Sequence, residues 1–266
     1  FIIGHLVFQK YHKTLTLKEV DSEYKMAFSN GAKPLVLDGL AFCVDAVDRH
    51  CYPGSGTTVT DLVTGQSGTI TNNPTVSDGC FNFAGNSSTD TIGTWTNING
   101  NMFCLGVWFY LDNFTDGNTT VDGVLRYKLG HGGDTGNTGA IAIGGVTGLV
   151  AGEVLTMTDR IDDASPYRRR SVTGITMAVG WHYAVFNYNG STYDIWLDNV
   201  SQSVTNSSQG AVPLTTCDNI TIGKSNSSGE NSLDGKIGPI HIYTKRALTD
   251  AEVSQNFNAQ RGRFGV

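Results

Sequence analysis

A tryptophan flanked by two carboxylates, at Asp194, Trp196 and Asp198, is the first place where this sequence could do chemistry. Successive side chains of a strand point to opposite faces, so these three residues share one face if the segment is extended. Two carboxylates about 5 Å apart can hydrolyse a glycosidic bond, one as nucleophile and the other as acid. Asp198-Asn199 also has the composition of a turn, which would take the second carboxylate out of the strand. A glycoside hydrolase is therefore the last of the three functions that we consider.

The other residues that could serve in catalysis do not form pairs. Glu153 and Glu230 have no carboxylate two residues away, and Glu252 fits the cap of a helix. The remaining glutamates, Glu19 and Glu23, lie close to the start of the sequence. No G-x-S-x-G sequence, which marks the nucleophile of many hydrolases, is present. We therefore predict no catalytic residues and no enzyme activity.

Three aspartates, Asp112, Asp116 and Asp122, gather in the stretch LDNFTDGNTTVDG. Calcium takes six to eight oxygen ligands from carboxylates, carbonyls and water, so this stretch is a candidate calcium site. The spacing is not that of an EF-hand loop, and Asp, Asn and Gly are also ordinary turn residues. We predict that no cofactor is required, with calcium as an optional ligand of these aspartates.

Sugar binding would use an aromatic ring beside amide or carboxylate groups. Trp95 and Trp196 are the candidate rings, and Asp194 is the candidate polar partner. Tryptophans are also common in hydrophobic cores, and core packing explains either ring as well. Both interpretations stay open at this point.

The composition limits the partners. The 266 residues carry a net charge of −6, which argues against nucleic-acid binding because that requires a basic surface. No apolar run approaches the roughly 20 residues that a membrane-spanning helix needs. Only 16% of residues are charged and 33 are glycine, while 39% are hydrophobic, which is typical of short strands joined by tight turns around a sizeable core.

The hydrophobic pattern predicts an all-β fold. Residues 102–111 are apolar on both faces, which indicates a strand at the centre of a two-layer sandwich. Residues 181–200 read as two alternating strands around Asn189-Gly190-Ser191, a strong hairpin signal. Turn signals recur without helical periodicity between them. The sequence thus predicts a two-sheet antiparallel jelly-roll sandwich.

One helix is predicted, at the C-terminal end. Thr249 and Glu252 have the spacing of a capping box, Val253 and Phe257 would share one face, and Gly262 would end the helix.

Residues 1–34 differ from the rest, because they are rich in lysine, poor in glycine and too short to fold alone. We predict an N-terminal arm over 1–34 that anchors the protein to a partner, followed by a jelly roll over 35–266. The cysteines are scattered and lie mostly in apolar runs, so we expect buried, mostly reduced thiols. They are Cys43, Cys51, Cys80, Cys104 and Cys217.

Four stretches in order resemble the laminin-G-like jelly roll of the concanavalin A-like lectin/glucanase superfamily. They begin with Leu40–Ala46, Cys80–Gly85 and Trp181–Val185, and end with the tail Gln255–Gly265. The tail is similar to the form of this domain found in virion proteins of tailed bacteriophages. Glucanases of this fold place two or three carboxylates on one strand, a pattern that this chain does not show.

The resemblance implies three functions. The first is a non-enzymatic virion structural protein of a tailed phage, displayed on the particle surface as a decoration, fibre or adhesion module. Residues 1–34 would then bind capsid or tail proteins, and the protein would form a homo-oligomer by analogy. The second is a lectin-like adhesin that binds a host-surface glycan with the help of calcium, and the third is the glycoside hydrolase.

Overall fold

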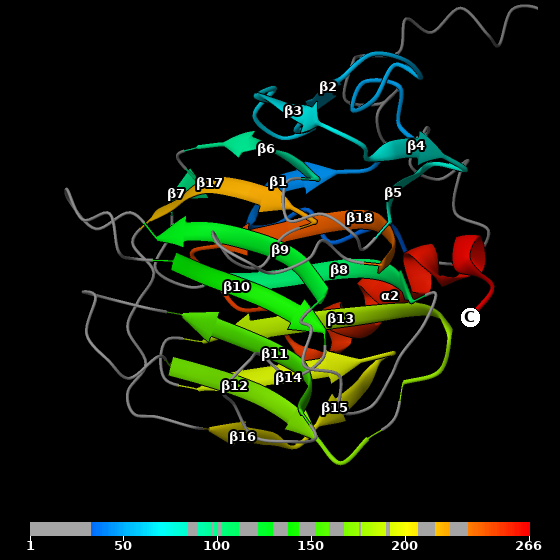
Figure 1. Cartoon of the computed structure of the whole chain (residues 1–266). Coiled ribbons are helices and arrows are strands. Elements are labelled where there is room, and N and C mark those ends of the chain that lie inside the picture. Colours follow the sequence, from blue (N-terminus) through cyan, green and yellow to red (C-terminus); the bar gives the residue numbers. More distant parts are fainter. Residues whose placement is uncertain are drawn as a thin grey trace, which may run out of the picture.

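The computed structural model describes residues 33–84, 90–96, 98–99, 103–111, 122–129, 138–143, 153–159, 168–175, 177–189, 192–206, 216–223 and 234–266. Within these ranges the strands form two antiparallel sheets, and the helix α2 (Asp250–Phe264) lies outside them (Figure 1). The predicted all-β sandwich with one C-terminal helix is confirmed. Residues 1–32 of the predicted arm lie outside the described residues, so the division at residue 34 stays a prediction.

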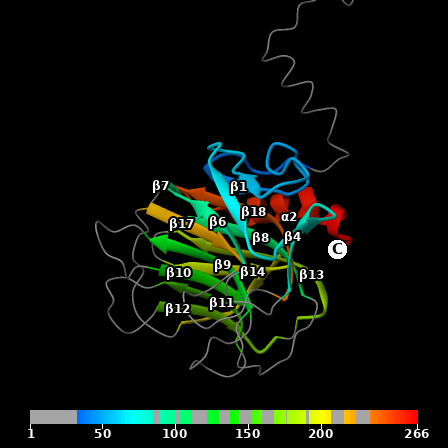
Figure 2. The ribbon, with the colours of Figure 1, turned by 45° about the horizontal axis from the view of Figure 1, so that its top comes forward.

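The first sheet has eight strands in the order β15-β14-β13-β8-β18-β5-β4, with β1 also paired to β18. Figure 2 shows β1 beside β18 at one end of the molecule. The strand bounds are β1 Leu40–Val44, β4 Thr75–Ser77, β5 Cys80–Ala84, β8 Phe103–Leu111, β13 Gly180–Tyr188, β14 Tyr193–Leu197, β15 Val200–Gln202 and β18 Asp234–Thr244.

The second sheet has ten strands in the order β16-β12-β11-β10-β9-β17-β6-β3-β2, with β7 paired to β17. The strand bounds are β2 Thr58–Thr60, β3 Ser67–Thr71, β6 Thr91–Trp95, β7 Ile98–Asn99, β9 Asp122–Leu129, β10 Thr138–Ile143, β11 Glu153–Asp159, β12 Arg168–Thr173, β16 Val204–Asn206 and β17 Thr216–Ile222.

The main core lies between the two sheets. Strand β8 shows why, because its alternate residues Leu105, Val107 and Phe109 join Ile92 and Ile220 of the other sheet in one buried cluster. The opposite face of β8 is also apolar, and there Cys104 and Trp108 are fully buried. As predicted for residues 102–111, this strand is central and both its faces are covered.

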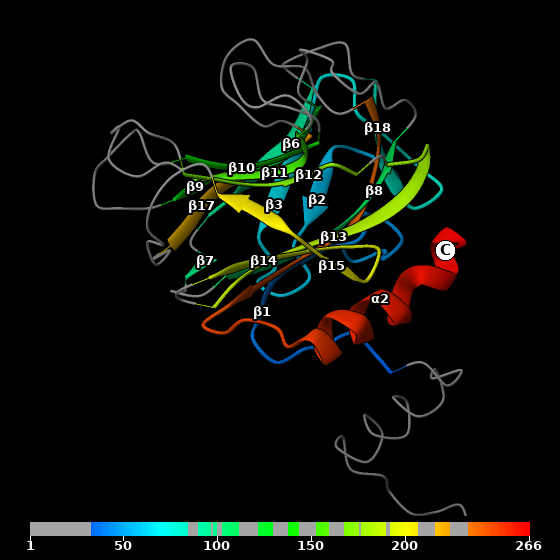
Figure 3. The same ribbon diagram turned by 90° about the horizontal axis from the view of Figure 1, so that it is seen from below.

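Helix α2 covers the outer face of the eight-stranded sheet, on the side away from the ten-stranded sheet (Figure 3). Val253, Phe257 and Phe264 of the helix are buried in a second cluster with Trp108 and Tyr183 of the sheet. The rings of Phe257 and Phe264 stack on Trp108, with centroids 5.6 and 4.4 Å away. The molecule therefore has three layers: sheet, sheet and helix.

The helix begins as predicted and ends later than predicted. Thr249 and Glu252 form the capping box, and Val253 and Phe257 share the buried face. Gly262 lies inside the helix, and the cap is Gly265, whose φ of 72° is in the left-handed region that favours glycine. The three added residues, 262–264, include Phe264, which extends the buried face by one further ring.

The hairpin predicted around Asn189 is confirmed. Strands β13 and β14 are paired, from Ala184 opposite Leu197 to Tyr188 opposite Tyr193. The next turn, between β14 and β15, uses Asp198 and Asn199 at φ 51° and 66°. Two consecutive positive φ angles are those of a type I′ hairpin turn.

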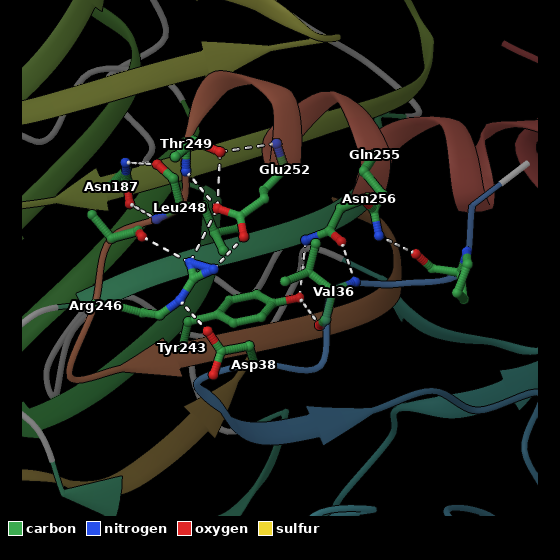
Figure 4. A network of polar contacts seen from close by, with 12 residues as sticks. Val36, Asp38, Asn187, Tyr243, Arg246, Leu248, Thr249, Glu252, Gln255 and Asn256 are labelled. Atoms are coloured by element: carbon green, nitrogen blue, oxygen red, sulfur yellow. Dashed lines mark hydrogen bonds and ion pairs between the residues drawn. The ribbon is translucent and has the colours of Figure 1, made fainter.

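A chain of hydrogen bonds holds the first described residues against α2 (Figure 4). The Val36 N–H donates to Asn256 Oδ1 at 2.8 Å, and the Tyr243 hydroxyl donates to the Val36 carbonyl at 2.9 Å. Asn256 Nδ2 donates to the same hydroxyl at 2.9 Å, and Gln255 Nε2 donates to the Pro34 carbonyl at 2.6 Å. The segment that leads into β1 is therefore fixed to the helix and to β18.

A second group of bonds fixes the start of α2. Arg246 donates to Asp38 Oδ2 at 3.0 Å and to both carboxylate oxygens of Glu252, which also caps the helix. Asn187 of β13 holds the residue before the cap, because its amide donates to the Leu248 carbonyl at 2.8 Å and accepts from the Leu248 N–H at 3.0 Å.

We expect Asn187→Ala to lower the free energy of unfolding by about 2–4 kcal/mol, because both backbone groups of Leu248 would lose their partner in a buried site. Chemical denaturation followed by fluorescence measures this change. Asn258→Ala is the control, since Asn258 is exposed on α2, and it should alter stability by no more than about 0.5 kcal/mol. Equal losses in the two variants would contradict the role given to Asn187.

Candidate functional site

Five residues on adjacent strands form a row across the outer face of the eight-stranded sheet. The register places Trp181 opposite Tyr110, Tyr110 opposite Lys236, Lys236 opposite Asn82, and Asn82 opposite Thr75. Every member is partly or fully exposed, although the residues that follow each in sequence are mostly core. We call Trp181, Tyr110, Lys236, Asn82 and Thr75 the outer row.

The outer row lies where α2 ends. Figure 1 shows the C-terminal end of α2 beside the end of β8. The ring of Phe264, the last residue of the helix, lies 4.4 Å from the ring of Trp181, with an angle of 47° between the planes. Trp181 also meets Tyr110 edge to face, with centroids 5.6 Å apart and planes at 69°. Two neighbouring rings thus hold the Trp181 indole in position while part of it remains exposed.

A glycine lets the helix approach this closely. A Cβ at Gly238 of β18 would lie 3.0 Å from Trp108 Cβ and 3.1 Å from the Phe264 ring. A side chain there would push Phe264 away from the sheet, and with it the ring that supports Trp181.

The polar end of the outer row consists of Lys236 and Asn82. The Lys236 ammonium lies 5.4 Å from the centroid of the Tyr110 ring, a cation–π distance. Asn82 Nδ2 donates to Ser77 Oγ at 3.1 Å and to the Thr75 carbonyl at 3.3 Å, which fixes the amide. No described residue donates to Asn82 Oδ1, so the partly exposed Asn82 offers an acceptor at the register position next to Lys236. Apolar ring faces next to fixed polar groups suit a ligand that has both apolar and hydroxylated surfaces.

The two tryptophans predicted as sugar platforms are not available on the surface. Trp95 is 1% exposed, packs edge to face on Phe42 at 5.2 Å, and lies over Gly68, where a Cβ would be 2.4 Å from the indole. Trp196 is 6% exposed and belongs to the cluster beneath α2. Each ring packs in a core, the alternative that the sequence left open, and the prediction of a platform at either position is wrong for this structure.

The predicted Asp194–Trp196–Asp198 face breaks at the turn. Asp194 and Trp196 lie on β14, and Asp194 is partly exposed; burial and then the charge of Asp250 raise the pKa of its carboxyl. Asp198 lies after the strand, where its oxygens accept from the Tyr183 N–H and pair with His182 Nδ1, both at 2.8 Å. The second carboxylate therefore fixes a turn and a histidine and does not face the first as a free group.

His182 is held on both sides. Its Nδ1 meets Asp198, and its Nε2 lies 2.8 Å from the Ala178 carbonyl. Burial alone would lower the pKa of His182, but the hydrogen bonds to Asp198 and Ala178 raise it above its usual value. Two acceptors are best satisfied when both ring nitrogens carry a proton.

The aspartates predicted to bind calcium are not brought together by the described residues. Asp112 and Asp116 lie outside these ranges, and Asp122 is the first residue of β9. No group of three or more His, Cys, Asp or Glu side chains that could hold a metal occurs among the described residues. The calcium site stays a prediction.

Two further expectations can be compared with the described residues. Cys43, Cys51, Cys80 and Cys104 are buried free thiols, as predicted. No described helix is long and apolar enough to cross a membrane.

Sequence reasoning did not find the outer row, because its members come from segments far apart in the chain. Trp181 opens a segment that the hydrophobic pattern did single out, and Tyr110 is the next-to-last residue of the most apolar strand. Their contact depends on β13 and β18 flanking β8, which no local pattern specifies. The one local signal is a lysine, Lys236, directly before the apolar run of its strand.

Comparison with known proteins gives one family. Residues 83–254, more than half of the chain, match the model described as "Concanavalin A-like lectin/glucanases superfamily". The comparison with curated proteins gives no match.

Solved structures share the fold at low sequence identity. The sialidase of Trypanosoma rangeli in complex with sialic acid is 14% identical with a TM-score of 0.58; the alignment covers 93% of this chain and 39% of the sialidase. Domain 4 of a GH43 extracellular arabinanase from Geobacillus stearothermophilus, in complex with arabinotriose, is 13% identical with a TM-score of 0.57, over 82% of this chain and 98% of the domain. The binding domain of botulinum neurotoxin serotype D/C is 11% identical with a TM-score of 0.57, over 84% of this chain and 52% of that one.

These likenesses correct the first of the three functions. The prediction of a phage virion structural protein, anchored to capsid or tail proteins through residues 1–34, is wrong. The similar structures are a sialidase with sialic acid, an arabinanase domain with arabinotriose and a toxin binding domain, and the lectin-like alternative fits them better. The fold itself is shared by enzymes and binding domains.

The protonated His182 should stabilise the fold below about pH 6.5, the usual pKa of histidine, and this contribution should disappear as the pH rises through the higher pKa of the folded state. We expect His182→Phe to lose about 1.5–3 kcal/mol of unfolding free energy at pH 5.5 and less at pH 8.5. Urea denaturation at both pH values measures the difference. A loss that is the same at the two pH values would show that His182 does not carry this charge.

Proposed function

Because this chain belongs to the concanavalin A-like lectin/glucanases superfamily, we propose that it is a non-enzymatic glycan-binding module whose ligand lies on the outer row. The observation that carries the proposal is the partly exposed indole of Trp181, held by Phe264 and Tyr110 beside the polar pair of Lys236 and Asn82.

The chemistry of the outer row supports a sugar as the ligand. A sugar ring has a face of C–H groups, which packs on an aromatic ring, and a rim of hydroxyls, which needs hydrogen-bond partners. Trp181 and Tyr110 offer the rings, and Lys236 and Asn82 offer a donor and an acceptor in adjacent register positions. The groups stand on paired strands, so little order has to be gained on binding.

Two of the similar structures hold sugars, since the sialidase is in complex with sialic acid and the arabinanase domain with arabinotriose. We take these complexes as support for a carbohydrate ligand in general and not for either sugar.

The proposal of a binding module, and not a glycoside hydrolase, rests on the carboxylates. In most families of glycoside hydrolases, hydrolysis uses a proton donor and a second carboxylate on opposite sides of one bond. Of the pair that the sequence offered, Asp198 is occupied by His182 and the Tyr183 N–H. The outer row itself contains no carboxylate.

Trp181→Ala should weaken glycan binding at least about 30-fold, because removal of a central aromatic group commonly costs 2 kcal/mol or more. A glycan array identifies a ligand for the wild type, and isothermal titration calorimetry with that ligand measures the loss. Val200→Ala is the control, since Val200 is an exposed apolar residue on β15, away from the row. Unchanged affinity in Trp181→Ala, with intact folding, would refute the proposed site.

Binding on the outer row uses no metal ligand among the described residues, so we expect the affinity to stay within about twofold when a chelator is added. Calorimetry in calcium and in chelator tests this expectation. Loss of binding in the chelator would instead favour the calcium-assisted alternative and direct attention to Asp112, Asp116 and Asp122.

A further inference from the structure

The charge in the outer row narrows the ligand class. Lys236 lies in the middle of the row, with Tyr110 on one side and Asn82 on the other. Among the described residues no carboxylate forms an ion pair with its ammonium, whose recorded contact is the Tyr110 ring. The cation is therefore free to pair with a ligand at the same place where the rings would hold it.

Asp45, an acidic residue that also acts on this part of the sheet, has a partner of its own. An ion pair joins Arg263 of α2 to Asp45, with both Asp45 oxygens 2.8 Å from Arg263 Nη1. Arg263 also donates to the Gly79 carbonyl, next to Cys80 on the strand that carries Asn82. Asp45 is thus occupied by its own partner and does not neutralise Lys236.

Burial raises the pKa of Cys80, while the charges of Arg263 and Lys236 both lower it and Asp45 raises it. Lys236 and Arg263 thus both lie close enough to Cys80 to act on the charge of its thiol.

The local charge contrasts with the net charge of −6 of the whole chain. The net charge opposes an anionic ligand at long range, but salt screens that effect beyond about 8 Å, whereas a direct contact is screened much less. The Lys236 ammonium beside the Tyr110 ring therefore favours an anionic group of the ligand at that position.

We infer that the outer row selects acidic glycans, with a sugar carboxylate paired to Lys236 while the sugar ring packs on Trp181 and Tyr110; this inference rests on the proposed function. The carboxylate would accept from the ammonium, and a hydroxyl of the same or the next sugar would donate to Asn82 Oδ1. Esterification of the carboxylate removes the charge and leaves the ring in place.

The test compares each acidic sugar with its neutral ester. Oligogalacturonates and sialyllactose, each beside its methyl ester, are titrated into the full chain by calorimetry. We expect the acid form of the bound sugar to bind about tenfold more tightly than its ester. Lys236→Met should bring the ratio of the two affinities close to one, and Lys236→Arg should retain most of it. Lys245→Met, at an exposed lysine outside the row, is the control and should keep the wild-type ratio.

The outcomes separate the two claims. Equal affinity of the wild type for acid and ester, with binding still lost in Trp181→Ala, would overturn the inference and keep the glycan-binding function. A preference for the acid that persists in Lys236→Met would also overturn it. Binding of no sugar, acidic or neutral, in these titrations and on an array would overturn the proposed function together with the inference.

Discussion

The packing of α2 on the outer face of the eight-stranded sheet is the contact on which the rest of the structure depends. The central strand β8 is apolar on both faces, so the sheet cannot leave its outer face to water, and the rings of Phe257 and Phe264 cover Trp108. Burial of each such ring contributes about 1.5–3 kcal/mol relative to exposure. The helix has 15 residues and ends at Phe264, and the next row of residues along the sheet is left partly exposed. The candidate site is thus the border of the hydrophobic layer that the helix creates.

This origin explains the composition of the outer row. Residues at the border of a core have one side in contact with buried rings and the other side in contact with solvent, and Trp and Tyr tolerate both. Trp181 is such a residue, because one side of its indole contacts the buried ring of Phe264 while part of it remains exposed. Lys236 fits the same place, since its aliphatic stem can lie along the sheet while the ammonium reaches the Tyr110 ring and the solvent. The rings that stabilise the helix on the sheet are therefore among those to which we assign the proposed binding of a ligand.

The architecture could be predicted from local patterns, and the site could not. The apolar run at 102–111, the Asn-Gly turn signal and the Thr249–Glu252 cap are each encoded within a few residues, and each reappears in the structure. The predicted end of α2 was wrong because Gly262 has the residue type of a helix stop. Packing of Phe264 on Trp108 extends the helix beyond Gly262, and the cap is Gly265. Trp95 and Trp196 were chosen for residue type alone, and burial, which depends on the register of the sheet, decides whether an indole is available. The outer row is a property of strand order, which brings residues 82, 110, 181 and 236 together.

The hydrogen bonds at Pro34 and Val36 affect how the domain would respond to a pulling force. The two backbone groups of Val36 and the carbonyl of Pro34 are bonded to Asn256, Tyr243 and Gln255, two of which lie on α2 and one on β18. Tension applied to the chain ahead of Pro34 would load these bonds before it reached β1. The first strand would then not peel from β18 one pair at a time, and the force would be distributed between the helix and the central sheet. A domain held in this way can resist pulling from its amino-terminal side while the strands that carry the outer row remain in register.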